Sequence, residues 1–244
     1  MNRAVLLVLY ALVTVLLVMW FAIEAPGIHS LDNGAQSVRV SRCFQDSRLS
    51  ESVATLKLQG GPAVTKVYES LLNKARTTPG CRTEIVQALI RSLEQATEPA
   101  ANHFENYFLW QHGSGLLADL KATEALDLLI ANINLTDGLS TSLSHCPALV
   151  AILKIGEPAI PKLEIALAKD PVSYRRSFEV LAIAYIGGAE AKKALTRALS
   201  RETDPCVKNF LVVSRQAFDN RVRPNHISSE LNGKWLSAFY CQNP

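Results

Sequence analysis

Residues 155–205 read IGEPAIPKLEIALAKDPVSYRRSFEVLAIAYIGGAEAKKALTRALSRETDP, and this stretch decides the fold class of the chain. Asp170-Pro171 and Asp204-Pro205 each predict the start of a helix, because the aspartate oxygen can accept hydrogen bonds from first-turn amides and proline fits the first helical position. Apolar residues at three- and four-residue spacing predict two helices over residues 172–200, separated by Gly187-Gly188. The stretch therefore predicts a helical hairpin of about 30 residues.

The same hairpin pattern recurs earlier in the chain. Residues 56–71 align with residues 153–167, since Pro62 and Pro158 open matching helices 96 positions apart, or three steps of 32. A weaker copy covers residues 116–133. Self-similarity at such a period is typical of a solenoid, in which each hairpin buries its apolar stripe only by stacking against its neighbours.

This pattern resembles consecutive HEAT repeats, and more narrowly the short bacterial type that is also found in phycobilin lyases. The matching features are the GEPAIP motif at residues 156–161, the Asp170-Pro171 turn and Arg175-Arg176. The resemblance extends over residues 145–215 and, less closely, over residues 50–76. It implies an all-α fold, a right-handed α-solenoid of stacked helical hairpins.

We expect the solenoid over residues 50–218 and a C-terminal capping helix over residues 219–244, with an exposed partner anchor as the alternative for the latter. The resemblance implies that the second helix of each pair lies on the concave side and that this face binds protein, as in most HEAT arrays. These second helices are expected near residues 62–76, 122–133, 158–169 and 189–200. Residues 97–115 fit the template poorly and predict a bend or an interruption.

Residues 4–23, AVLLVLYALVTVLLVMWFAI, carry no charge and are long enough for a helix to span about 30 Å of hydrocarbon. They predict a signal anchor over residues 1–24, followed by a juxtamembrane linker over residues 25–49. Arg3 precedes the span and no Lys or Arg follows before residue 39, so the N-terminus is expected in the cytoplasm. The body would then be exported, facing the periplasm from a bacterial inner membrane. The alternative is a cleaved signal peptide.

Composition and cysteine spacing argue against nucleic-acid binding and against a CxxC metal or redox site. The formal net charge is only +3, and Lys and Arg form no block, so a nucleic-acid partner is not indicated. The five cysteines include no CxxC pair. In an exported body, we expect Cys43–Cys81 and Cys206–Cys241 disulfides, because each would tie a terminal segment to its neighbour. Cys146 is expected as a small buried hydrophobe.

Arg175 and Arg176 follow the Asp170 turn and admit two interpretations. They could be cations on a binding face. The resemblance instead implies that such an arginine hydrogen-bonds the Asp-bearing turns of adjacent repeats, and we favour that structural role.

Three histidines, His103, His112 and His145, show no HxxxH or HExxH spacing, and we predict no metal site. The sequence His112-Gly113-Ser114-Gly115 weakly resembles an oxyanion or phosphate loop, but no GxSxG or P-loop pattern supports it. We therefore predict no catalytic residue and no cofactor.

Beside these residues stand Tyr107, Phe108 and Trp110. Aromatic residues in a helical segment are expected mostly in the core, with an exposed contact patch as the alternative.

Taken together, the sequence predicts a membrane-tethered, non-enzymatic HEAT-repeat scaffold that binds another protein or peptide. Residues 4–23 would hold the membrane contact. The first alternative is a secreted periplasmic HEAT-repeat binding module after signal-peptide cleavage. A lyase-like enzyme, suggested by the narrower resemblance, is the second.

Overall fold

The computed structural model describes residue 43 and residues 46–97, 103–136 and 143–219. Contacts divide the chain at Val40 and Ser41, and every described residue belongs to the second unit. Residues 1–42 and 220–244 lie outside the described part, so the predicted anchor, most of the linker and most of the predicted C-terminal cap are not described. Among the described residues, no helix is both long and apolar enough to cross a bilayer.

All regular structure in the described part is helical, which confirms the predicted all-α class. The α-helices are α2 (Asp46–Thr55), α3 (Pro62–Thr77), α4 (Cys81–Gln95), α5 (His103–Asp119), α6 (Leu126–Ala131), α7 (Pro147–Ile155), α8 (Ile160–Lys169), α9 (Ser173–Ile186), α10 (Gly188–Arg201) and α11 (Pro205–Asp219). Short 3-10 helices η1 (Thr123–Ala125), η2 (Leu143–His145) and η3 (Glu157–Ala159) precede α6, α7 and α8.

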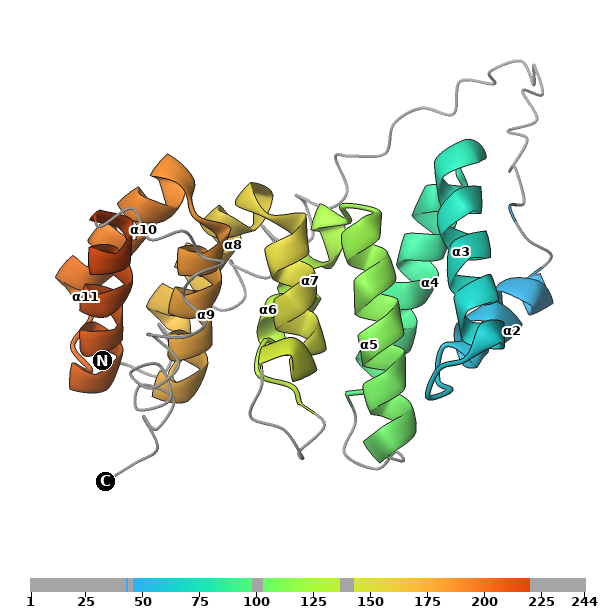
Figure 1. Ribbon diagram of the computed structural model, residues 1–244, viewed down its shortest axis with the longest axis horizontal. Helices are drawn as coiled ribbons and strands as arrows, with labels where there is room; N and C mark the ends of the chain where they lie inside the picture. The colour runs from blue at the N-terminus through green and yellow to red at the C-terminus, as the bar shows by residue number, and fades with distance from the viewer. Residues whose placement is uncertain (1–42, 44–45, 98–102, 137–142, 220–244) are drawn as a thin grey trace, which may run out of the picture. The chain divides into compact units, whose positions relative to one another are not determined.

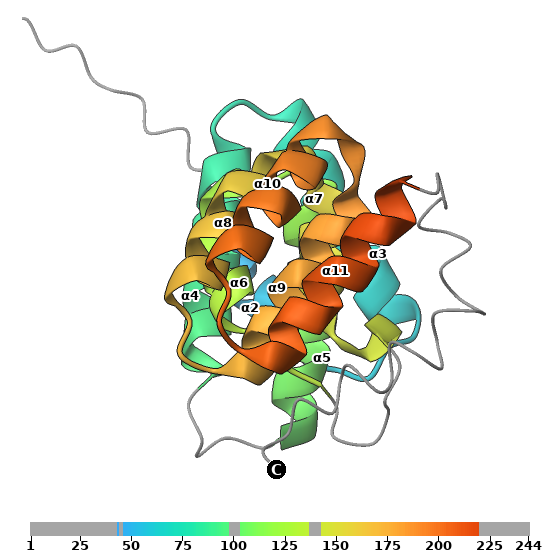
Figure 2. The same ribbon diagram turned by 90° about the vertical axis from the view of Figure 1, so that its left-hand side faces the viewer.

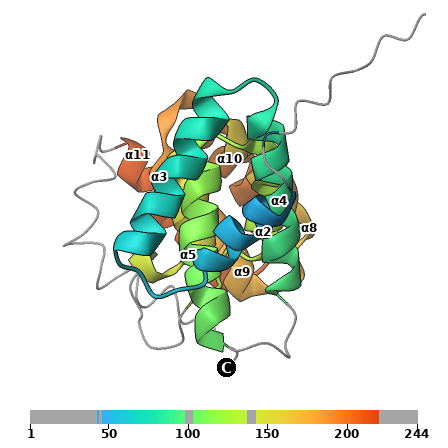
Figure 3. The ribbon, with the colours of Figure 1, turned by 90° about the vertical axis from the view of Figure 1, so that its right-hand side faces the viewer.

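From α3 onward the helices alternate between two rows (Figure 1). Row A contains α3, α5, α7, α9 and α11, and each packs on the next in the row. Row B contains α4, α6, α8 and α10, of which α6 packs on α8 and α8 on α10. Views from the two ends place α4 and α8 on one side and α3 and α11 on the other (Figures 2 and 3). Helix α2 packs against α3, α4 and α5.

One apolar core lies between the two rows. It contains mainly leucine, isoleucine and alanine, with Trp110 and Phe178 as its largest buried side chains. Helix α8 shows the underlying pattern, since Ile160, Leu163 and Leu167 recur at three- and four-residue spacing and are all buried. No single hairpin could cover such a stripe alone, so burial depends on its neighbours.

Glycines end two row A helices where the sequence predicts a break. Gly156 follows α7 with φ 86°, and Gly187 follows α9 with φ 75°. These left-handed conformations are disfavoured for residues with a Cβ. Each glycine leads into a row B helix, so the chain reverses at the same point in consecutive hairpins.

The two Asp-Pro pairs behave differently. Asp204 caps α11 as predicted, because its Oδ1 accepts hydrogen bonds from the amides of Cys206 at 2.9 Å and Val207 at 3.1 Å. The predicted start at Asp170 is wrong, since α9 begins at Ser173. Asp170 ends α8 instead, and its Oδ1 accepts from the Val172 amide at 2.8 Å, which closes a turn before the helix begins.

Residues 103–115, which belong to the segment that fits the repeat template poorly, lie in a regular helix, and the expected bend or interruption of the array stays a prediction. Helix α5 runs without a break from His103 to Asp119. Gly113 and Gly115 lie in its interior, where an added Cβ would approach Leu93 at 3.4 Å and the Tyr68 hydroxyl at 3.6 Å. These glycines are therefore sites of close helix packing, and the His112–Gly115 segment is not a loop.

Helix α3 differs from the expected arrangement as well. The sequence groups residues 62–76 with the other second helices, but α3 packs on α5 in row A. Residues 122–133, 158–169 and 189–200 do supply row B, through η1 and α6, η3 and α8, and α10. The sequences around Pro62 and Pro158 are similar because both begin a helix. That similarity does not determine the row in which the helix packs.

The predicted Cys43–Cys81 disulfide is confirmed, with a Cα–Cα distance of 5.0 Å. It ties Cys43, three positions before the start of α2, to the first residue of α4. Cys146 is buried and outside any disulfide, as predicted. Cys206 is disulfide-bonded, while Cys241, its predicted partner, lies outside the described residues.

Candidate functional site

Ion pairs connect successive helices on the exposed side of row B. Each pair joins one row B helix, or the 3-10 helix before it, to the next: Arg82–Glu124 at 2.6 Å, Lys162–Asp127 at 2.6 Å and Arg197–Glu164 at 2.6 Å. The hydrogen bond from Arg82 lowers the pKa of Glu124, and the hydrogen bond from Arg197 lowers that of Glu164. Because these pairs are partly exposed, they fix the register of neighbouring helices more than they stabilise them.

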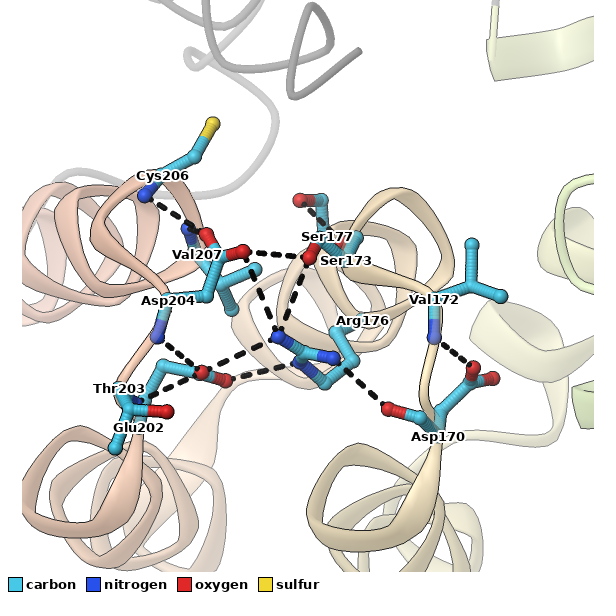
Figure 4. A network of polar contacts seen from close by, with 10 residues as sticks. All are labelled: Asp170, Val172, Ser173, Arg176, Ser177, Glu202, Thr203, Asp204, Cys206 and Val207. Atoms are coloured by element: carbon cyan, nitrogen blue, oxygen red, sulfur yellow. Dashed lines mark hydrogen bonds and ion pairs between the residues drawn. The ribbon is translucent and has the colours of Figure 1, made fainter. Parts of the chain in front are cut away.

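Arg176 connects two turns of the chain (Figure 4). Its Nη1 donates to the Asp170 carbonyl at 2.9 Å, in the turn between α8 and α9. Its Nε donates to Glu202 Oε2 at 3.1 Å, in the turn between α10 and α11. Asp204 lies 3.8 Å from the same guanidinium and accepts from the Ser173 hydroxyl at 2.6 Å. Arg176 therefore has the predicted structural role between Asp-bearing turns.

Arg175 pairs within its own turn, with Nε 2.6 Å from Asp170 Oδ2. Glu179 follows on the same helix and is only 1% exposed. Its Oε2 atom has no hydrogen-bond partner among the described residues. Burial, and then the negative charge of Asp170, raise the pKa of Glu179 to about 8 against the opposing effect of Arg175 and Arg176. The Glu179 carboxyl is therefore mostly protonated at neutral pH.

Asp119 forms a second polar junction, at the end of α5. The Tyr68 hydroxyl donates to its carboxylate, and the Lys154 ammonium pairs with it, so α3, α5 and α7 meet there. Burial acts to raise the pKa of Asp119, but hydrogen bonds from Lys154 and Tyr68 outweigh it and lower the value. Burial and the Asp119 carboxylate raise the pKa of Tyr68. The junction positions helices and leaves Tyr68 as a neutral donor.

Two grooves flank α8 on row B. The α6–α8 groove has a volume of about 350 Å³ and is lined by Asp127, Ile130, Ala131, Lys162, Ile165, Ala166, Lys169, Asp170, Pro171 and Arg175. The α8–α10 groove has a volume of about 270 Å³ and is lined by Glu164, Leu167, Ala168, Asp170, Arg176, Ala198, Arg201, Glu202 and Thr203. Ile165 is 55% exposed, although it belongs to an otherwise core-forming helix. These grooves offer aliphatic surface bordered by charge.

A third hollow, of about 530 Å³, lies between α2 and α4. Its lining is mostly polar and includes Lys57, Glu84 and Arg91. It contains no histidine or cysteine and no buried carboxylate. We assign the candidate site to the grooves beside α8, because Ile165 is exposed there among charged groups.

The histidines singled out in the sequence do not form a site. His112 is half-buried on α5, where burial lowers its pKa against a hydrogen bond with the Leu58 backbone. His145 lies in η2, and His103 begins α5 with its side chain outside the described part. Within the described ranges, no three His, Cys, Asp or Glu side chains gather as metal ligands.

The aromatic residues are mainly core, as expected. Tyr107 is 9% exposed and Trp110 only 1%, so the alternative of an exposed patch is wrong for these two. Phe108 is half-buried and contacts the Tyr107 ring edge-to-face, with centroids 5.7 Å apart. The aromatic cluster therefore holds α5 in place and offers little surface to a partner.

Sequence reasoning did not identify Ile165, Lys169 or Arg201 as site residues. The sequence does contain a pattern that marks the two cations. A basic residue followed by an acidic one occurs 32 positions apart, as Lys169-Asp170 and Arg201-Glu202, at the ends of α8 and α10. The exposure of Ile165 follows from the helical period, because it lies about 200° around α8 from Leu163 and so opposite the buried stripe. No family model, curated protein or solved structure matches this chain, so its site is interpreted from geometry alone.

Proposed function

We propose that this protein is a membrane-tethered, non-enzymatic α-solenoid of the HEAT type that binds another protein through row B. The observation that carries the proposal is the pair of open grooves beside α8, with Ile165 exposed in the α6–α8 groove. Protein-binding surfaces combine apolar and polar groups, so grooves of this composition support a binding role. The alternation of helices between two rows supports the solenoid, since stacked hairpins create extended binding faces.

The membrane tether rests on the uncharged stretch at residues 4–23. The Cys43–Cys81 disulfide supports an exported body, because disulfides form and persist mainly in oxidising compartments. The disulfide-bonded state of Cys206 gives the same support. Export would place the row B grooves on the same side of the membrane as an extracytoplasmic partner.

The binding proposal is tested by placing a photo-cross-linking amino acid in the full-length chain, in its own cells. Position 165 lies on row B, and position 150 is the matched control, because Val150 is 42% exposed on α7 of row A. We expect a discrete adduct from position 165 and none of the same mass from position 150. Equal adducts from both positions, or none from either, would contradict the proposal.

Membrane fractionation and sequencing of the mature N-terminus test the tether. An intact Met1 in the membrane fraction supports the anchor, and an N-terminus near residue 25 in the soluble periplasmic fraction would support the secreted module instead. Mass spectrometry without reduction tests the compartment, because free thiols at Cys43 and Cys81 would argue against export.

A further inference from the structure

The charges that line the two grooves beside α8 do not cancel. Every carboxylate in their linings is already bonded to a cation, in the pairs Asp127–Lys162, Glu164–Arg197, Asp170–Arg175 and Glu202–Arg176. By contrast, Lys169 and Arg201 make no ion pair and no side-chain hydrogen bond in the described part of the chain, although the charge of Arg201 also lowers the pKa of Glu164. The charge that remains for a ligand is therefore positive.

Lys169 and Arg201 occupy equivalent places in consecutive hairpins. They are the last residues of α8 and α10, which lie side by side (Figure 2). Lys169 lines the α6–α8 groove and Arg201 lines the α8–α10 groove, and both are exposed. A cation in the last turn also favours a helix through its dipole. That effect leaves the donor hydrogens of both side chains available to a ligand.

One exposed aliphatic side chain lies in the same groove as Lys169. Ile165 lines the α6–α8 groove and is 55% exposed, whereas Ile130 of that groove and Leu167 of the α8–α10 groove are buried. An exposed isoleucine beside an unpaired ammonium selects a ligand that carries both an aliphatic side chain and a carboxylate. A ligand with only one of these features leaves either the charge or the apolar surface unmatched.

We propose that the two grooves bind an acidic, amphipathic segment of a partner protein. Its aliphatic side chains would cover Ile165, and its carboxylates would meet Lys169 and Arg201. The inference rests on the proposed function and specifies the chemistry of the partner. A nucleic acid fits less well, because it offers phosphates to the two cations but no aliphatic side chain to Ile165.

The test uses the full-length protein in detergent and two synthetic amphipathic peptides of equal length. Both peptides carry leucines at the same positions, and their polar faces are either all glutamate or all lysine. Fluorescence anisotropy should show that the glutamate peptide binds and that the lysine peptide does not. Raising the salt concentration should weaken the binding. Equal binding of both peptides, or no binding of the glutamate peptide, overturns the inference.

A charge-reversal variant locates the interaction. Lys169→Glu with Arg201→Glu should weaken binding of the glutamate peptide about tenfold or more. The matched control is Lys66→Glu with Lys208→Glu, which makes the same charge change on exposed positions of α3 and α11 in row A. Equal losses in the two variants would overturn the inference, as would displacement of the peptide by an oligonucleotide at equal concentration.

The two proposals fail in different ways. If position 165 yields a cross-linked partner but the glutamate peptide does not bind, the inference about acidic chemistry falls and the binding function stands. If position 165 yields no adduct and the peptide does not bind, both fall. Circular dichroism of each variant shows whether the helices remain folded, and Lys169→Arg with Arg201→Lys should retain binding.

Discussion

Replacing Arg176 by methionine should destabilise the fold far more than the same change at Arg197. Both arginines hold a glutamate through two nitrogens: Arg176 bonds Glu202 at 3.1 and 3.3 Å, and Arg197 bonds Glu164 at 2.6 Å twice. The pairs differ in burial, since the side chains of Arg176 and Glu202 are only 13% and 9% exposed. Geometry alone would rank Arg197 as the stronger pair, and burial reverses that ranking.

The magnitude follows from what each substitution leaves behind. Without Arg176, the Glu202 carboxylate stays buried and keeps only the amides of Thr203 and Asp204 as donors, and the Asp170 carbonyl loses its 2.9 Å bond. Breaking a buried pair costs about 3–5 kcal/mol, and the two remaining amides favour the lower end, about 3 kcal/mol. Arg197 is exposed, so water replaces its partner and we expect little change.

Urea unfolding of the full-length chain without reductant, followed by circular dichroism at neutral pH, measures both effects. The double variant Arg176→Met, Glu202→Met should be more stable than Arg176→Met alone, because it does not leave the Glu202 carboxylate buried without its cation. Equal losses at Arg176 and Arg197 would refute the argument that burial determines the contribution of these pairs.

Three further predictions concern the core and its covalent tie. Between pH 4.5 and pH 8 the folded state keeps a proton on Glu179 that the unfolded state releases. As the pH rises through that window, the stability of the wild type relative to Glu179→Gln should fall by about 1.4 kcal/mol per pH unit. A difference in urea midpoint between the two proteins that does not change with pH would contradict this. Gly113→Leu should cost about 1–3 kcal/mol in thermal unfolding, because even a Cβ there lies 3.4 Å from Leu93, whereas Gly113→Ala should be tolerated. Cys43→Ser removes a disulfide between residues 38 positions apart and should lower the free energy of unfolding by about 4 kcal/mol. Peptide mapping without reduction that finds no Cys43–Cys81 link would contradict this.

Several features could be predicted from the sequence because they depend on local information. The helical class follows from apolar spacing, and the break at Gly187 follows from the backbone freedom of glycine. The Asp204 cap needs only an aspartate followed by proline and two free amides. The Cys43–Cys81 pairing came from a weaker argument, that a bond there ties a terminal segment to the body.

At other positions a neighbouring element overrides the local pattern. Gly113 and Gly115 are poor helix formers, yet α5 continues through them where it faces Leu93 and Tyr68. The Asp170-Pro171 pair predicts a helix start, but Asp170 is held in a turn by Val172 and Arg175.

The sequence by itself determined that this protein is built of short amphipathic helices with breaks at glycine and Asp-Pro positions. Only the tertiary structure decided which side of each helix stays open. Glu179 of α9 is an ionisable residue, yet it is only 1% exposed. The reason is physical: periodicity defines an apolar face, but solvent exposure depends on which helices pack beside it. The pairing that leaves Lys169 and Arg201 available arises from the same packing.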